Sequence, residues 1–214
     1  MKGIQWIHDL QKEYELVREH DPAIHSKWEV TLYPYYIAMQ AYRRAHELYL
    51  NGHYYLARRI SQRASRRTGI EIHPGATIGK NFFIDHGTGV VIGETAEIGD
   101  NVFLYHGVTL GGTGKDVGKR HPTVGNNVMI GAESVILGPV TIGDNVVIGA
   151  STVVMTDIPA NTTVVGAPMR IVKRRTEAGT YIYDHEGRFR YFLDKEGLQH
   201  DDPPEDDPLY EDLP

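Results

Sequence analysis

The residues that could do chemistry in this sequence are its histidines and a glycine-rich basic stretch, GGTGKDVGKRH, at positions 111–121. Two of the eleven histidines lie close to this stretch or to a coil turn and follow a charged residue: His86 follows Asp85, and His121 follows Arg120. Histidine suits general-base chemistry, because its unperturbed pKa of about 6.5 lets it take a proton near neutral pH. The chain has no cysteine, which excludes disulfides, thiolate metal sites and a cysteine nucleophile.

The glycine-rich stretch does not fit a phosphate-binding loop, whose pattern is G-x-x-x-x-G-K-[ST]. In its two possible registers the first glycine falls on Thr109 or Thr113. The final hydroxyl position is then Asp116 or Arg120. The dinucleotide pattern G-x-G-x-x-G also fails, because Val117 stands at its third glycine. The residues around the stretch must therefore explain it.

A six-residue repeat surrounds this stretch. Three runs of aliphatic residues recur every six positions, and many members are followed by glycine: Ile72 to Val90, Ile92 to Leu110, and Val124 to Val154. A period of six is neither helical nor a simple strand alternation, and it is the signature of a hexapeptide β-solenoid. Three hexads make one triangular coil, and stacked coils bury a continuous core that a single coil cannot form.

The glycine-rich stretch is then an excursion from the solenoid. Leu110 and Val124 are both hexad starts, yet they lie fourteen residues apart where one hexad needs six. Residues 111–123 therefore form a loop of about eight extra residues. Function concentrates in long loops on rigid scaffolds, and this loop carries Lys115, Lys119, Arg120 and His121.

The segments before and after the repeats have other patterns. Helices are expected over residues 4–17, 33–50 and 54–67. Asn51-Gly52 separates the last two, and Gly69 ends the third. Asp21-Pro22 predicts a further helix start, with the aspartate as N-cap. Residues 180–192 indicate a hairpin, and the acidic, proline-rich tail after His200 is expected to be disordered or loosely docked.

The expected fold class is α+β. An N-terminal helical domain covers residues 1–70, the solenoid covers 71–175 with the loop 111–123, and the hairpin and tail cover 176–214. The formal net charge of −6 argues against a nucleic-acid partner. The N-terminus has neither a signal-peptide pattern nor an apolar run long enough for a membrane span, so a cytoplasmic protein is expected.

Four segments closely resemble the serine O-acetyltransferases: IDHGTGVVIGET at 84–95, GVTLGGTGK at 107–115, KRHPT at 119–123 and VVGAPMRIV at 164–172. DPA at 21–23 and YRRAH at 42–46 fit the same family, so the resemblance covers roughly residues 15–175. Any hexapeptide acyltransferase would share the repeats. The DH, GGTGK and RHP segments together are more specific to this family.

The resemblance implies a left-handed parallel β-helix that forms trimers, a fold that departs from the usual right-handed crossover rule. It implies transfer of an acetyl group from acetyl-CoA to the hydroxyl of L-serine. The product, O-acetyl-L-serine, would serve cysteine biosynthesis, and cysteine would inhibit at the serine site. Acetyl-CoA is then a co-substrate, and neither a permanently bound cofactor nor a metal is expected.

The same resemblance assigns the catalytic residues. His86 is the general base for the serine hydroxyl, and Glu71 is the carboxylate that orients it. Their spacing places them in adjacent coils and permits the pairing, although aspartate is common in the family where Glu71 stands. His121 contacts the substrate and assists catalysis. Without the resemblance, His86 is equally a turn histidine, Glu71 a solvated turn residue and His121 a loop decoration.

The resemblance also assigns the binding residues. Arg120 holds the serine carboxylate through its bidentate fork, and Asp21 and Asp85 meet the serine amine. The glycines of the loop allow the backbone to approach the thioester and offer an N–H to the developing oxyanion. The residues implied for acetyl-CoA are Gly112, Thr113, Gly114, Ala132, Ala150 and Lys173.

The resemblance bears on partners as well. Larger members have a longer helical N-terminus that joins two trimers, whereas about seventy residues precede the coils here, so a trimer and a dimer of trimers both stay open. Members that dock into O-acetylserine sulfhydrylase, the next enzyme, end in isoleucine. This chain ends Asp212-Leu213-Pro214, which argues against that complex.

Three other functions are compatible with such a solenoid. A γ-class carbonic anhydrase needs three zinc-binding histidines, two of them close in sequence, and His86, His106 and His121 lack the close pair. A sugar or xenobiotic acetyltransferase differs only in its acceptor, and the DPA and RHP segments favour an amino acid. A non-catalytic trimeric sensor of cysteine is disfavoured because both candidate histidines are retained.

Overall fold

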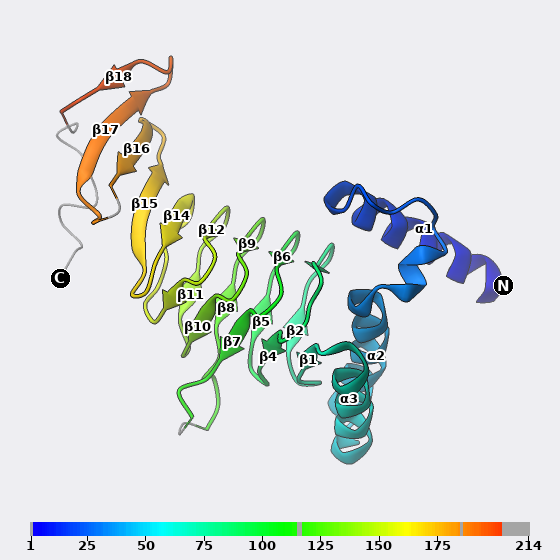
Figure 1. Ribbon diagram of the computed structural model, residues 1–214. Coiled ribbons are helices and arrows are strands. Elements are labelled where there is room, and N and C mark those ends of the chain that lie inside the picture. Colours follow the sequence, from blue (N-terminus) through cyan, green and yellow to red (C-terminus); the bar gives the residue numbers. More distant parts are fainter. Residues whose placement is uncertain (1, 115–116, 185, 203–214) are drawn as a thin grey trace.

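The computed structural model describes residues 2–114, 117–184 and 186–202, with side chains from residue 10 onward. Helices lie at one end of a parallel β-helix (Figure 1). They are α1 (Lys2–His20), the 3₁₀ helix η1 (Glu29–Leu32), α2 (Pro34–Leu50) and α3 (Tyr54–Thr68). The three predicted helices are confirmed. Pro34 suits the first turn of α2, and Gly69 ends α3 with a left-handed φ of 73°. The predictions for Lys115 and for the tail from residue 203 lie outside the described residues.

The predicted helix start at Asp21-Pro22 is wrong. The helix α1 ends at His20, and the next residues form a turn in which Asp21 Oδ1 accepts a hydrogen bond from the Ala23 N–H at 2.8 Å. An aspartate that caps such a turn has the same local sequence signal as a helix N-cap. In both cases its carboxylate accepts a hydrogen bond from a backbone N–H a few residues later in the chain. Only the path of the following chain separates the two.

The coils of the β-helix contribute one short strand each to three parallel sheets, called A, B and C here, except that the last coil adds only a bridge from Ile158 to Ile142 in sheet B (Figure 1). Sheet A contains β1 (Glu71–Ile72), β4 (Val91–Ile92), β7 (Thr109–Gly111), β10 (Val135–Leu137) and β13 (Val153–Val154). Sheet B contains β2 (Thr77–Ile78), β5 (Glu97–Ile98), β8 (Thr123–Val124) and β11 (Thr141–Ile142). Sheet C begins with β3 (Phe83–Ile84), β6 (Phe103–Leu104), β9 (Met129–Ile130), β12 (Val147–Ile148) and β14 (Thr162–Val165). The turns between sheets form three corners, A/B, B/C and C/A, named in chain order.

The hexapeptide prediction is confirmed by the core. The aliphatic residue that starts each hexad is buried in every coil except at Ile78, which is half-buried. Burying one such side chain stabilises the fold by about 1.5–3 kcal/mol relative to exposure. The excursion loop does not disturb the stack, because Glu97 still pairs with Thr123 and Thr123 with Thr141.

An asparagine ladder follows the B/C corner. Its side chains donate from one coil to the next at 2.8–3.2 Å, through Asn81, Asn101, Asn127, Asn145 and Asn161. Each member has a positive φ between 52° and 61°, a region that asparagine tolerates better than most residues. The ladder therefore fixes both the turn shape and the register of successive coils.

The helices close the first coil of the β-helix. Tyr42 of α2 donates from Oη to the Ala76 carbonyl at 2.7 Å, and Ser61 of α3 donates to the Ile72 carbonyl. The buried Glu13 of α1 binds Arg43 at 2.8 Å and accepts from Tyr35 Oη at 3.1 Å. Tyr42 and Ser61 therefore hold α2 and α3 against the first coil, and Glu13 holds α1 against α2.

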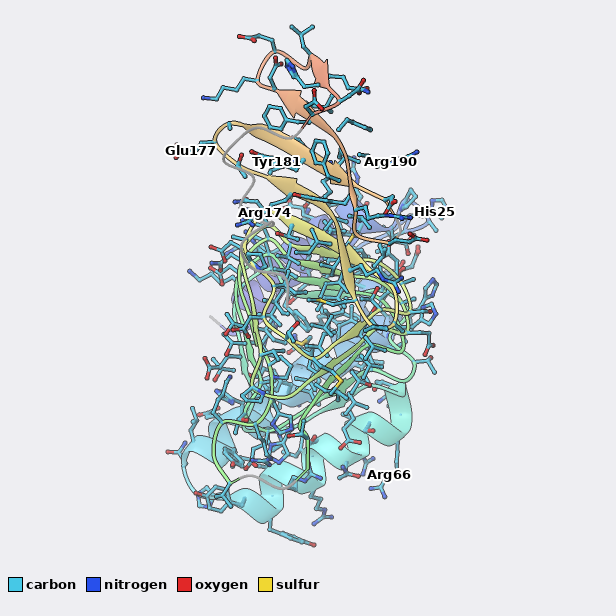
Figure 2. The ribbon with its side chains drawn as sticks, turned by 90° about the vertical axis from the view of Figure 1, so that its left-hand side faces the viewer. His25, Arg66, Arg174, Glu177, Tyr181 and Arg190 are labelled. Carbon is cyan, nitrogen blue, oxygen red and sulfur yellow. The ribbon has the colours of Figure 1, made fainter. Side chains whose placement is uncertain are left out.

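The C-terminal strands extend sheet C. β15 (Arg170–Arg175), β16 (Gly179–Tyr183), β17 (Phe189–Asp194) and β18 (Gln199–His200) add to β14 in antiparallel order. Tyr181, Tyr183 and Phe192 form a second small core there. Figure 2 looks from this end and shows these strands projecting beyond the coils, with Arg66 of α3 pointing away at the opposite edge. The predicted hairpin is confirmed as β16–β17, whereas β15 was not expected.

Candidate active site

The predicted catalytic histidines lie at two different corners of the triangular coil. His86 lies in the turn from β3 to β4, which is the C/A corner. His121 ends the loop from β7 to β8, which is the A/B corner. Sheet A separates these two corners. One chain therefore presents two separate groups of predicted site residues.

The C/A group lines a cavity of about 350 Å³ beneath η1 and the start of α2. Asp21, Asp85 and His86 meet there with Tyr33. Tyr33 Oη donates to Asp21 Oδ2 at 2.6 Å, while the other carboxylate oxygen accepts from the Ala23 N–H. The bond from Tyr33 and then the bond from Ala23 lower the pKa of the Asp21 carboxyl. The carboxylate is therefore held ionised in a fixed orientation.

His86 itself is open to solvent. Its side chain is 77% exposed, and its Nε2 lies 3.7 Å from Asp85 Oδ2. Its backbone has a φ of 58°, which is uncommon for a residue with a side chain and occurs often at functional sites. Glu71 lies half-buried in β1 and pairs through its backbone with Val91. No hydrogen bond or ion pair joins Glu71 to His86 in the described part of the chain, so its orienting role stays a prediction.

The A/B group is held by Thr95, which the sequence did not single out. The Nδ1 of His121 lies 3.2 Å from the Thr95 N–H and 2.9 Å from Thr95 Oγ1. A backbone N–H can only donate, so Nδ1 is an acceptor and the neutral ring carries its proton on Nε2. Burial, then the nearby positive charge of Arg120, lowers the pKa of His121. His121 is therefore a neutral N–H donor.

Glycine makes room for this ring. A β-carbon on Gly93 would fall 2.0 Å from Cδ2 of His121, so no other residue fits there without moving the imidazole. A β-carbon on Gly112 would lie 3.3 Å from Nε2 of His121. The donor nitrogen of His121 thus lies against the backbone of the glycine-rich loop.

Arg120 is anchored by a carboxylate that was also missed. Its Nη2 pairs with Glu94 Oε2, and Glu94 Oε1 accepts from Tyr49 Oη at 2.7 Å. The hydrogen bond from Tyr49 and then that from Arg120 lower the pKa of Glu94 to about 2. A guanidinium has five N–H donors, so donors remain for a substrate carboxylate. The sequence signal for Glu94 and Thr95 was their place at the end of the segment IDHGTGVVIGET, which resembles the family, but neither residue was singled out there.

The lowered pKa of Glu94 predicts acid-dependent stability. The folded value of about 2 lies below the unfolded reference of 4.5, so the stabilisation is complete above pH 4.5 and is lost as pH falls towards 2. In urea titrations between pH 7 and 3, Glu94→Gln is expected to lower the free energy of unfolding by a constant amount above pH 4.5. Below pH 4.5 the difference in the free energy of unfolding between wild type and Glu94→Gln should shrink.

The matched control for this titration is Glu97→Gln. Glu97 is an exposed carboxylate that pairs with Lys119 of the excursion loop at 3.0 Å. Exposed pairs contribute little to stability, so this variant should follow the wild type closely at each pH. A difference between Glu94→Gln and wild type that stays constant down to pH 3 would contradict the role given to Glu94.

The residues implied for acetyl-CoA fall on both corners. Ala132 and Ala150 each lie two residues past a strand of sheet C, on the same C/A corner as His86. Gly112, Thr113 and Gly114 leave β7 at the A/B corner instead. Lys173 lies in β15, opposite Thr163 of β14. The structure therefore does not bring these residues together within one chain.

Two larger cavities in the described part of the chain lie away from both groups of predicted site residues. Cavities of about 490 and 470 Å³ flank α1, and their described linings include none of the predicted site residues. The described residues contain no cluster of three or more histidine, aspartate or glutamate side chains arranged to hold a metal ion. Within the same residues, no helix is both long enough and apolar enough to cross a membrane.

Comparison with known proteins identifies the family. The model of the bacterial transferase hexapeptide family (six repeats) matches residues 121–155. A serine acetyltransferase of Helicobacter pylori is 55% identical over 167 residues, which are 78% of this chain and 98% of that protein. The chain belongs to the serine acetyltransferase family. The serine acetyltransferase of Bacillus subtilis is 54% identical over 164 residues, covering 76% of each chain.

Solved structures of serine acetyltransferases have the same fold. The Neisseria gonorrhoeae enzyme in complex with serine superposes with a TM-score of 0.73 at 42% identity, over 79% of this chain and 69% of that one. The Brucella abortus enzyme in complex with coenzyme A gives a TM-score of 0.74 at 42% identity, over 78% and 68%. The predicted fold, helices followed by a left-handed parallel β-helix, is therefore confirmed.

Proposed function

We propose that this chain transfers the acetyl group of acetyl-CoA to the hydroxyl of L-serine, giving O-acetyl-L-serine and CoA. The observation that carries the proposal is the C/A cavity, where Asp21 and Asp85 accompany the open imidazole of His86. Carboxylates suit an ammonium group, and an imidazole free to accept a proton suits a hydroxyl. The relatives solved with serine and with coenzyme A support the same pair of substrates.

The two histidines have different roles in this reaction. His86 takes the proton of the serine hydroxyl as the oxygen attacks the thioester. His121 is not the base, because its Nε2 already carries the proton while Nδ1 accepts from Thr95. It donates a hydrogen bond to the substrate instead. Arg120 binds the serine carboxylate, and Glu71 remains the proposed orienting group for His86.

The complete site is shared between chains of a trimer. Sheet A separates the C/A group from the A/B group within one chain, so the A/B group of a neighbour must complete the cavity around His86. The hexapeptide fold of the family supports a closed threefold ring. The same arrangement lets CoA run along Ala132 and Ala150 of one chain and beneath Gly112 to Gly114 of the next.

Regulation and further assembly follow from the same proposal. Cysteine resembles serine in its amine and carboxylate, so it competes for Asp21, Asp85 and Arg120 and inhibits. Neither a second trimer nor a complex with the sulfhydrylase is required for the chemistry. A sugar acceptor is the second candidate, because it would need the same base and the same acetyl donor.

The acceptor is tested by the release of CoA from acetyl-CoA across a panel of amino acids and sugars. Release with L-serine and not with galactosides is expected, because the carboxylates and Arg120 match the charges of an amino acid. L-alanine is the matched control, since it has the same charged groups without the hydroxyl. Release with galactosides but not with serine would overturn the acceptor assignment.

A further inference from the structure

His106 shares a column with the proposed base and the proposed CoA-lining alanines. His86, His106, Ala132 and Ala150 each lie two residues past a strand of sheet C, namely β3, β6, β9 and β12. Those strands pair in register, Ile84 with Leu104, Leu104 with Ile130, and Ile130 with Ile148. His106 is therefore the next residue after His86 along the C/A corner, on the side from which the CoA arm would approach.

One nitrogen of His106 is closed off by its own chain. Nδ1 is buried and has no hydrogen-bond partner among the described residues. A proton on Nδ1 would be a buried donor without an acceptor, which costs more than leaving a lone pair unused. The proton of the neutral ring therefore belongs on Nε2. Neither a ligand nor a neighbouring chain can reach Nδ1, so Nε2 is the nitrogen available for function.

The His106 ring is also fixed in place beside the base. It lies edge-to-face with His86, with 6.2 Å between the ring centroids. Its backbone carbonyl accepts from the Glu133 N–H at 3.0 Å, and the next residue, Gly107, donates to the Thr88 carbonyl at 2.9 Å. The ring is thus a preorganised N–H donor one coil away from the group that activates the hydroxyl.

We propose that the Nε2–H of His106 donates a hydrogen bond to the carbonyl oxygen of the acetyl thioester and stabilises the charge that develops on it. This inference rests on the proposed function. His86 removes the serine hydroxyl proton while the serine oxygen bonds to the carbonyl carbon. The π-electron pair of the C=O bond moves onto the carbonyl oxygen, which faces His106. The electron pair on that oxygen then re-forms the C=O bond, the C–S bond breaks, and the sulfur leaves with the electrons of the C–S bond. It takes the proton from His86, so the products are O-acetylserine and CoA, and His106 neither gains nor loses a proton.

Amide variants separate the two nitrogens of His106. In His106→Gln the amide nitrogen reaches the place of Nε2, whereas in His106→Asn it reaches only the place of Nδ1. His106→Leu removes both. Loss of one preorganised oxyanion donor lowers kcat by about 10²–10³. We expect that loss in His106→Leu and His106→Asn, and we expect His106→Gln to keep kcat within about tenfold of wild type.

The affinity for CoA is the measurement that would change if His106 had only a structural role. CoA lacks the acetyl carbonyl, so its Kd, measured by calorimetry, should stay within about threefold of wild type in all three variants. Wild-type kcat in His106→Leu, equal losses in the Gln and Asn variants, or a CoA affinity that falls in step with kcat would each overturn the proposal. If the wild type itself releases no CoA with serine, the proposed function fails and this inference with it. Normal wild-type turnover with an active His106→Leu variant sinks this inference alone.

Discussion

Replacement of His86 by alanine is expected to lower kcat by roughly 10²–10⁴, the usual contribution of a positioned general base. The structure gives the physical reason for singling out this histidine. His86 is open, whereas Nδ1 of His121 is held as an acceptor and its Nε2 carries the proton. Steady-state rates of CoA release with saturating serine and acetyl-CoA measure the effect. The KM for serine should change less than in Arg120→Ala.

Two further variants make this test specific. His25→Ala removes an exposed histidine outside both groups of site residues, and it should keep wild-type kcat. His121→Ala removes a hydrogen-bond donor and not the base. The limb of the pH–rate profile that reports the base should therefore persist in it and vanish in His86→Ala. A folded His86→Ala protein with unchanged kcat would remove His86 from the role of base.

Mixing two inactive variants is expected to restore activity if the site is shared between chains. His86→Ala and His121→Ala homotrimers should each be nearly inactive. Unfolded together in equal amounts and refolded, they assemble at random. A site is intact when the chain that supplies His86 and the neighbour that supplies His121 are both unmutated at those positions. The chance is one half for each, so about a quarter of the wild-type activity should return in a closed heterologous trimer.

A second mixture gives the matched control. Wild type mixed equally with the double variant should retain about a quarter of full activity if two chains form each site, and about a half if one chain does. The geometric basis is the separation of the C/A and A/B corners by sheet A. Charge-tag separation confirms that mixed trimers of the two single variants have formed. If those mixed trimers recover no activity, both histidines act within one chain.

The sequence determined the parts of this protein that depend on local pattern. A period of six sets which side chains point to the axis, so the coils, the core and the excursion between Leu110 and Val124 could all be predicted. The helix ends at Pro34 and Gly69 followed from backbone preferences of single residues. The candidate residues themselves came from short motifs that resemble those of a known family.

Tertiary structure alone decided what depends on contacts between distant residues. Asp21 has the local signal of a helix cap, and only the path of the chain makes it a turn that binds Tyr33. The strand β15 has no alternation to reveal it, because its partner β14 and not its own pattern makes it a strand.

The chemistry of the histidines was decided in the same way. The proton on His121 is placed by Thr95, twenty-six residues earlier in the chain and one coil away. His86 and His121 lie at separate corners, because His86 follows a strand of sheet C and His121 ends the loop that follows a strand of sheet A. A proton position is set by neighbours in space, and a one-dimensional pattern contains only neighbours in sequence.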